Sequence, residues 1–230
     1  MKIKQANALI DRLEDILPQT QCTKCGYPDC RAYAQALATG EVRPNRCPPG
    51  GVEGIRRLSA ALEPIFPQDA FAQNPVIVPE CGEERTRAIA FIDPKQCIGC
   101  TLCIQACPVD AIVGASKQMH VVLDQWCTGC DLCLPPCPVD CITMIEVSNH
   151  QTGWDAWSAE LADEARSRYH SRSLRLDREI RDNEERLAKK AAAKLTVVNA
   201  ERPDSEEAKK EQDRKRAIIA AAIARAAQQK

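Results

Sequence analysis

The sequence has few aromatic residues and no long apolar run at its start. Aromatic side chains make up 4% of the 230 residues. The first residues, Met1 to Ala8, are polar and too few to span a bilayer, and they lack the apolar stretch of a secretory signal. No G-x-G-x-x-G loop that could cradle phosphates is present, and no nucleophile–base arrangement stands out. These absences argue against export, a membrane span of its own and an intrinsic enzyme activity.

Cysteine, in contrast, is abundant, with 14 residues. Eight of them form two copies of the spacing C-x-x-C-x-x-C-x-x-x-C-P, which begin at Cys97 and Cys127. These are metal-ligand spacings, so a disulfide scaffold is disfavoured. The run is typical of [4Fe–4S] clusters, whereas zinc sites usually use two separated Cys-x-x-Cys pairs. Two cubane clusters without another active site predict a carrier of single electrons.

The spacing also predicts which cysteines share a cluster. Three cysteines at i, i+3 and i+6 wrap around one cluster, and the fourth, before proline, reaches the partner cluster. The predicted ligand sets are Cys97, Cys100, Cys103 and Cys137 for one cluster and Cys107, Cys127, Cys130 and Cys133 for the other. This crossing would tie the two repeats into one unit.

The repeat extends beyond the cysteines with a constant offset of 30 residues. Short apolar runs at 88–92, 111–113, 121–123 and 141–145 predict strands around a small helix. The predicted fold is therefore α+β, with a duplicated bacterial-type 2[4Fe–4S] ferredoxin domain over 88–148. Cys141 aligns with Ala111, which favours a small buried residue over a ligand.

A third cysteine site lies nearer the N-terminus and comprises Cys22, Cys25, Cys30 and Cys47. Its spacing alone leaves zinc, a two-iron cluster and a four-iron cluster open, and the two neighbouring cubane motifs favour a third cubane. A helix from Cys30 to Leu37 is expected to bring Cys47 back to the site. An amphipathic helix over 2–17, ended by Pro18, is expected to pack on this small helical module. Its apolar residues are Ile3, Ala6, Ile10, Leu13 and Leu17.

The three cysteine sites are accompanied by the segments Ile16-Leu17-Pro18-Gln19, Gln21-Cys22-Thr23-Lys24-Cys25-Gly26-Tyr27-Pro28 and the run from Cys107 to Gly114. In these features the sequence resembles the B subunit of the Rnf electron transport complex. The resemblance covers about residues 10–145. It implies three [4Fe–4S] clusters, with the N-terminal cysteines as ligands of the first. It also implies work in a membrane assembly that moves electrons between reduced pyridine nucleotide and ferredoxin-like acceptors, coupled to ion transport.

The chain departs from that family at its start, because typical B subunits begin with an apolar membrane span. We therefore expect a cytoplasmic protein that reaches the cytoplasmic face of the inner membrane through redox partners, including membrane-embedded Rnf-like subunits. The alternative is a free soluble ferredoxin that serves cytoplasmic oxidoreductases.

The remaining residues form a charged helical tail. Residues 161–230 hold 18 lysine and arginine residues against 13 aspartate and glutamate residues. Helices are predicted over 160–195 and, after a break at 196–203 and a capping signal at Asp204-x-x-Glu207, through Ala227. The mixed charge and the lack of aromatic interleaving disfavour nucleic-acid binding. A solvated helix is the simplest interpretation. The alternatives are docking on an acidic partner and folding back onto the acidic redox part of the chain.

The predicted division of the chain has four parts: an N-terminal helix and cluster module over 1–63, a linker over 64–87, the ferredoxin domain over 88–148 and the tail over 149–230. Cys81 lies in the linker without a partner at ligand spacing and is expected to be free. None of the three histidines stands at ligand spacing, so surface or packing roles are expected for them. Trp126, next to Cys127, is expected to shield its cluster from water.

Overall fold

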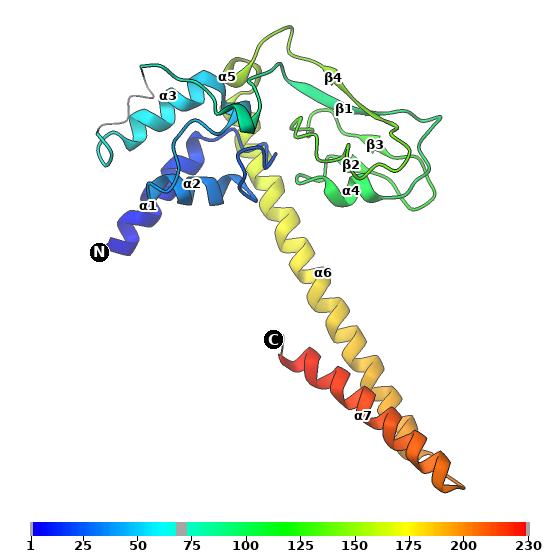
Figure 1. Ribbon diagram of the computed structural model, residues 1–230. Coiled ribbons are helices and arrows are strands. Elements are labelled where there is room, and N and C mark those ends of the chain that lie inside the picture. The colour runs from blue at the N-terminus through cyan, green and yellow to red at the C-terminus, as the bar shows by residue number, and fades with distance from the viewer. Residues whose placement is uncertain (1, 68–72, 229–230) are drawn as a thin grey trace. The chain divides into compact units, whose positions relative to one another are not determined.

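The computed structural model describes residues 2–67 and 73–228, which form two compact units that divide after Arg172. The first unit is a mixture of helices and short strands, and the second is helical (Figure 1). This confirms the α+β class and the helical C-terminal region. The predicted linker over 64–87 includes residues 68–72, which lie outside the described ranges.

Three helices make the N-terminal part of the first unit. Helix α1 spans Lys2–Ile16, α2 spans Cys30–Ala38 and α3 spans Gly51–Leu62. Helix α1 packs against both others (Figure 1). This confirms the predicted amphipathic helix and its packing on the cysteine module, although the side chains of Ile3 and Ala6 lie outside the described residues. The core they share contains Leu13, Leu17, Tyr33, Ala34, Leu37, Leu58, Ala61 and Leu62.

Two short strand pairs follow, and each pair is antiparallel. Strand β1 (Ala88–Ile92) pairs with β4 (Ile142–Glu146), with Ala90 opposite Met144. Strand β2 (Ile112–Val113) pairs with β3 (Val121–Val122). The four predicted strands are thus present at nearly the predicted positions. The short helix α4 (Leu102–Ala106) lies between β1 and β2.

Short helical segments close the connections between these parts. The 3₁₀ helix η1 (Pro48–Gly50) leads into α3, η3 (Pro79–Cys81) precedes β1, and α5 (Gly153–Ala156) follows β4. Glu84 links α3 to α5. Its carboxylate accepts hydrogen bonds from the Val52 backbone N–H at 2.8 Å and from the Thr152 hydroxyl at 2.6 Å. Gly51, at φ 61°, leaves room for this carboxylate, since a Cβ there would lie 2.4 Å from it. One carboxylate therefore fixes the start of α3 against α5.

Helix α6 (Ala159–Ala200) begins in the first unit and ends in the second, and α7 (Glu206–Gln228) follows (Figure 1). The predicted break at 196–203 and cap at Asp204 were wrong in position. The helix continues to Ala200, because Gln212 donates from its amide to the Val198 and Glu201 carbonyl oxygens at 2.6 and 2.8 Å. Ser205 caps α7 instead of Asp204, through its hydroxyl oxygen and the Ala208 N–H at 3.1 Å. In the described ranges no helix combines the length and the apolar character needed to cross a membrane.

Candidate functional site

The four N-terminal cysteines converge from two loops and one helix start. Cys22 and Cys25 lie between α1 and α2, Cys30 is the first residue of α2, and Cys47 directly precedes η1. Cys22, Cys25 and Cys47 are buried and Cys30 is partly exposed. We call these four residues the first cysteine group.

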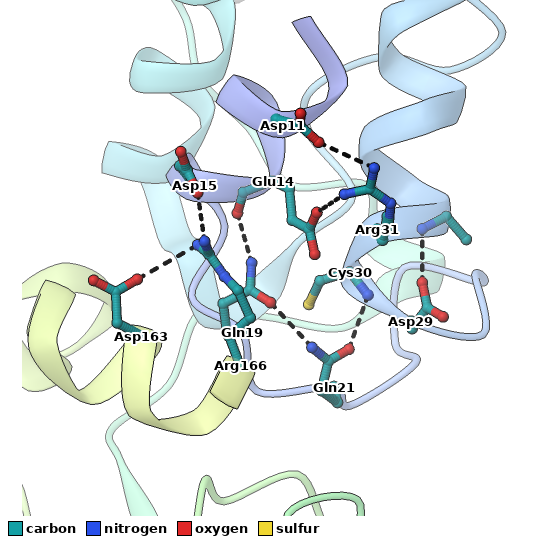
Figure 2. A network of polar contacts seen from close by, with 11 residues as sticks. Asp11, Glu14, Asp15, Gln19, Gln21, Asp29, Cys30, Arg31, Asp163 and Arg166 are labelled. Carbon is teal, nitrogen blue, oxygen red and sulfur yellow. Dashed lines mark hydrogen bonds and ion pairs between the residues drawn. The ribbon is translucent and has the colours of Figure 1, made fainter. Parts of the chain in front are cut away.

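Glutamine side chains shape the loop that carries this group. Gln19 and Gln21 both adopt a left-handed backbone conformation, at φ 55° and 54°, which is unusual for residues other than glycine. Their amides hold the loop in place: Gln19 donates to the Glu14 carbonyl oxygen at 2.5 Å, and Gln21 donates to the Gln19 side-chain oxygen at 3.0 Å. The Gln21 oxygen in turn accepts the Cys30 N–H at 2.9 Å (Figure 2). The same amide thus orients the loop and satisfies the start of α2.

Ion pairs beside this loop connect α1 to α2 and to α6 (Figure 2). Arg31 of α2 forms ion pairs with Glu14 and, at 3.0 Å, with Asp11 of α1. Arg166 of α6 reaches Asp15 at 2.5 Å. The two helices that flank the cysteine loop, α1 and α2, are therefore joined directly, and α6 is joined to α1.

The thiols of the first group lie close enough to affect one another's ionisation. Burial raises the pKa of Cys25, Cys30 and Cys47, and negative charge on the neighbouring cysteines, Cys22 among them, raises each pKa further. Four thiolates in one buried site repel each other strongly. Such a site needs a positively charged centre to hold its cysteines in the ionised form.

A second group joins cysteines from both repeats. Cys107, Cys127, Cys130 and Cys133 line one small cavity together with apolar residues of β1, β2 and β4, among them Ala90, Ile112 and Met144. Burial, with negative charge from Cys107 and Cys127 among the further causes, raises the pKa of Cys130 and Cys133 to about 12. Backbone N–H groups point at two of the sulfur atoms, from Ala111 to Cys107 at 3.2 Å and from Ala90 to Cys127 at 3.5 Å. The chain thus supplies four sulfurs around one space and N–H donors directed at them.

The third group contains the remaining motif cysteines. Cys97 and Cys100 lie in the loop before α4, where their charges add to the effect of burial and raise the pKa of Cys103 to about 11. The Cys141 sulfur lies 3.5 Å from the Cys137 sulfur and within range of the Cys97 charge. Cys137 is therefore next to the loop of the first repeat.

Cys137 and Cys141 respond differently to their surroundings. Burial acts to raise the pKa of Cys137, but the backbone N–H groups of Val139 and Cys141 and the Cys141 thiol donate hydrogen bonds to its sulfur and lower the pKa below its usual value. Burial and the Cys137 charge raise the pKa of Cys141 to about 12. Within this pair the shifts run in opposite directions, down for the pKa of Cys137 and up for that of Cys141. The prediction that Cys141 is a small buried residue is confirmed.

The loops of the first and second groups contact each other directly. The Thr128 hydroxyl donates to the Thr20 carbonyl oxygen at 3.0 Å. Lys24 and Arg85 both form ion pairs with Asp131, the former at 2.8 Å. These contacts join the residues around Cys22 and Cys25 to those between Cys127 and Cys133.

Two further residues near the cysteine groups were not foreseen in these positions. His120 is 2% exposed, and its Nδ1 lies 3.2 Å from the Cys103 sulfur. Cys81, expected to be free in the linker, is buried and near enough for its charge to raise the pKa of Cys25. Neither stands at ligand spacing in the sequence, so no motif could have revealed them. At Trp126, the Arg168 guanidinium lies 3.8 Å from the ring centroid.

None of the 14 cysteines, which all lie in the described ranges, forms a disulfide. Among the described residues, no three His, Cys, Asp or Glu side chains lie close enough together to hold a single metal ion. Groups of four cysteine sulfurs are nevertheless the donor set of iron–sulfur clusters, which bind thiolates at separate irons. The donor chemistry of the three groups fits such clusters.

Comparison with known proteins identifies the family. The family described as "4Fe-4S dicluster domain" matches residues 90–144, and that described as "Putative Fe-S cluster" matches residues 17–49. The B subunit of the ion-translocating oxidoreductase complex of Shewanella sp. (strain MR-7) is 50% identical over 151 residues, which are 66% of this chain and 73% of the relative. The chain belongs to the family of these B subunits.

Other members match over a shorter range. The corresponding B subunit of Azoarcus sp. (strain BH72) is 55% identical over 120 residues, and that of Thiobacillus denitrificans is 50% identical over 121 residues. These matches cover 52% of this chain in both cases and 61% and 59% of the two relatives, so the chain spans about three fifths of their length. No solved structure matches the chain. Membership of this family, together with the two matched iron–sulfur regions, indicates an iron–sulfur protein.

Proposed function

We propose that this chain is an electron-transfer protein with three [4Fe–4S] clusters that relays single electrons within an Rnf-type ion-translocating oxidoreductase complex. The observation that carries the proposal is the second cysteine group, in which Cys107 of one repeat lines a common cavity with Cys127, Cys130 and Cys133 of the other. This arrangement supports the crossed ligand pattern of two-cluster ferredoxins. The named relatives are subunits of ion-translocating oxidoreductase complexes.

Each cluster would have its own set of four cysteines. The first set is Cys22, Cys25, Cys30 and Cys47, the second is Cys97, Cys100, Cys103 and Cys137, and the third is Cys107, Cys127, Cys130 and Cys133. A [4Fe–4S] cluster takes up and releases one electron without making or breaking a bond in a substrate. The protein's part is to bury the sulfurs, direct N–H donors at them and exclude water.

The backbone supports a duplicated ferredoxin domain over 88–148. Left-handed conformations recur with the 30-residue offset of the sequence repeat: Gly99 and Gly129 have φ 69° and 68°, and Thr101 and Asp131 have φ 68° and 66°. Two loops with the same sequence spacing thus make the same unusual turns. The boundaries 1–63, 64–87, 88–148 and 149–230 remain our proposal for the four parts of the chain.

Contacts between the cysteine loops support an order for the three sites. The first set lies beside the Cys107-containing set, through the Thr128–Thr20 hydrogen bond and the Lys24–Asp131 ion pair. That set shares a domain with the set around Cys97. We therefore place the Cys107-containing set between the other two, with docking of redox partner proteins at the outer sites. We place the protein at the cytoplasmic face of the inner membrane, held by membrane-embedded partner subunits.

The test is anaerobic purification of the tagged chain from its own cells, with iron and sulfide analysis and identification of the co-purifying proteins. We expect about twelve irons and twelve sulfides for three four-iron clusters, and integral redox subunits in the membrane fraction. A preparation with eight irons would refute the number of three clusters. Recovery without any redox subunit would favour a free ferredoxin and refute the assignment to a complex.

A further inference from the structure

His120 is a buried histidine in contact with a cysteine of the third group. It lies directly before β3, is 2% exposed, and places Nδ1 3.2 Å from the Cys103 sulfur. Gly114, which follows β2 directly, makes room for the ring, because a Cβ at this position would lie 2.3 Å from the imidazole Cδ2. The backbone of the β2–β3 connection is thus fitted to this side chain.

The surroundings of the ring decide which nitrogen carries the proton. A ligating thiolate has lone pairs and no proton, so it can only accept a hydrogen bond. With a cluster on Cys103, the nitrogen that faces its sulfur would therefore be the donor, Nδ1–H. The other nitrogen, Nε2, is buried and finds no hydrogen-bond partner in the described part of the chain. Nδ1 is thus the ring nitrogen placed to interact with the Cys103 sulfur.

We infer that His120 sets the reduction potential of the cluster on Cys97, Cys100, Cys103 and Cys137 by donating a hydrogen bond to the Cys103 sulfur. This inference rests on the proposed function, since it requires a cluster on those four cysteines. Reduction adds negative charge to the cluster and its sulfurs, so a donor fixed at one sulfur stabilises the reduced form more than the oxidised form. The ring is buried, where this interaction is only weakly screened. His120 is a positioning residue that acts through Cys103.

The sequence repeat contains a built-in comparison. The residue 30 positions after His120 is His150, and the residue 30 positions after Cys103 is Cys133. The His150 side chain is 92% exposed, and its ring lies near the exposed carboxylate of Glu146. Only one of the two equivalent histidines is therefore directed at a cluster-site sulfur. The two clusters of the ferredoxin domain should have different potentials for this reason.

The experiment is an anaerobic redox titration of the full chain, followed by electron paramagnetic resonance, in four forms: wild type, His120→Leu, His120→Asn and His150→Leu. Leucine fills similar space without a donor, and the asparagine amide places an N–H near the position of Nδ1. We expect His120→Leu to lower the reduction potential of one cluster. The ratio of its reduced to its oxidised form at a fixed ambient potential should fall about tenfold, which corresponds to about 59 mV for one electron. His120→Asn should restore most of this shift, and His150→Leu should leave all potentials unchanged.

The outcomes separate this inference from the proposed function. Unchanged potentials in a fully loaded His120→Leu variant would overturn the role of His120 and leave the clusters in place. Equal shifts in the leucine and asparagine variants would overturn the hydrogen bond in favour of a packing effect. A wild type without four-iron clusters would overturn both proposals.

A measurement on the wild type covers the case in which His120→Leu fails to load its cluster. The chain has three histidines, and His150 and His170 are exposed, so labelling with ¹⁵N-histidine is nearly site-specific. Electron–nuclear double resonance on the reduced protein should detect one weakly coupled ¹⁵N nucleus with an exchangeable proton, as expected for a nitrogen that donates to a ligand sulfur and is not bound to iron. The absence of that coupling would overturn the inference.

Discussion

The Trp157 indole offers a direct test of how the strand-containing part is joined to the first cysteine module. Trp157 is 5% exposed, and its Nε1–H donates to the Pro18 carbonyl oxygen at 2.8 Å. Replacing it with phenylalanine removes the donor and leaves that buried carbonyl without its partner. Leaving a buried polar group unsatisfied costs about 1–3 kcal/mol. For a chain of this length a loss of about 2 kcal/mol corresponds to a melting temperature lower by about 4–8 °C.

Trp154 provides a matched control three residues earlier. Both rings lie under an arginine, with the guanidinium carbon of Arg57 4.7 Å from the Trp154 ring centroid and that of Arg87 4.8 Å from the Trp157 centroid. Phenylalanine keeps much of this cation–π contact in both cases. The Trp154 indole nitrogen is buried but finds no acceptor among the described residues. The two variants thus lose the same ring atoms, and only Trp157→Phe loses a hydrogen bond.

The assay is anaerobic thermal unfolding followed by circular dichroism, with peptide-level hydrogen exchange to locate the change. We expect Trp157→Phe to melt below Trp154→Phe by the interval given above, and exchange to increase in the peptide that contains Pro18. Equal melting temperatures for the two variants would refute the reasoning, because the shared loss of ring volume would then explain the whole effect.

Three further predictions follow from the cysteine groups and their contacts. Asp131→Asn breaks the ion pairs with Lys24 and Arg85. It should lower the free energy of unfolding, measured in urea, by up to about 1 kcal/mol, because the side chains are partly exposed. A loss of the same size in high salt would contradict this prediction. Cys137→Ala should remove one cluster, about four irons by analysis, whereas Cys141→Ala should keep all clusters, and equal iron contents would count against the ligand set. Reconstitution of the cluster-free chain should improve as the pH rises from 7 to 9, because thiols must lose their protons to bind iron. Burial raises the pKa of Cys103 to about 11 and that of Cys130 to about 12. Cluster loading that does not depend on pH would contradict the direction of these shifts.

Local patterns in the sequence predicted the elements well. The helix expected from Cys30 to Leu37 exists as α2 over Cys30–Ala38, and the Asp29 carboxylate accepts the Ala32 N–H at 2.7 Å at its start. The cysteine spacings and the turn glycines are likewise local signals, so the three groups could be proposed from the sequence. The role of these cysteines as ligands remains a prediction.

Features that depend on contacts between distant residues could not be predicted from local sequence patterns. Thr196, Val197 and Val198 are weak helix formers, so a break was expected there, but a side chain 14 residues away stabilises the last turn of α6. His120 and Cys103 are 17 residues apart and meet because β2 and β3 pair and return the chain to α4. Such contacts follow from tertiary packing, which no spacing rule describes.

The position of Cys107 in the second group has a consequence for the synthesis of the protein. Its cavity is completed by Cys127, Cys130 and Cys133, which leave the ribosome some 20 residues later. A nascent chain that ends after the first repeat therefore exposes a thiol whose neighbours do not yet exist. Neither repeat produced as a separate fragment has a complete set of four sulfurs in this arrangement. With the proposed ligand sets, neither cluster site of the ferredoxin part is complete before residue 133 has emerged, and the set around Cys97 also waits for Cys137.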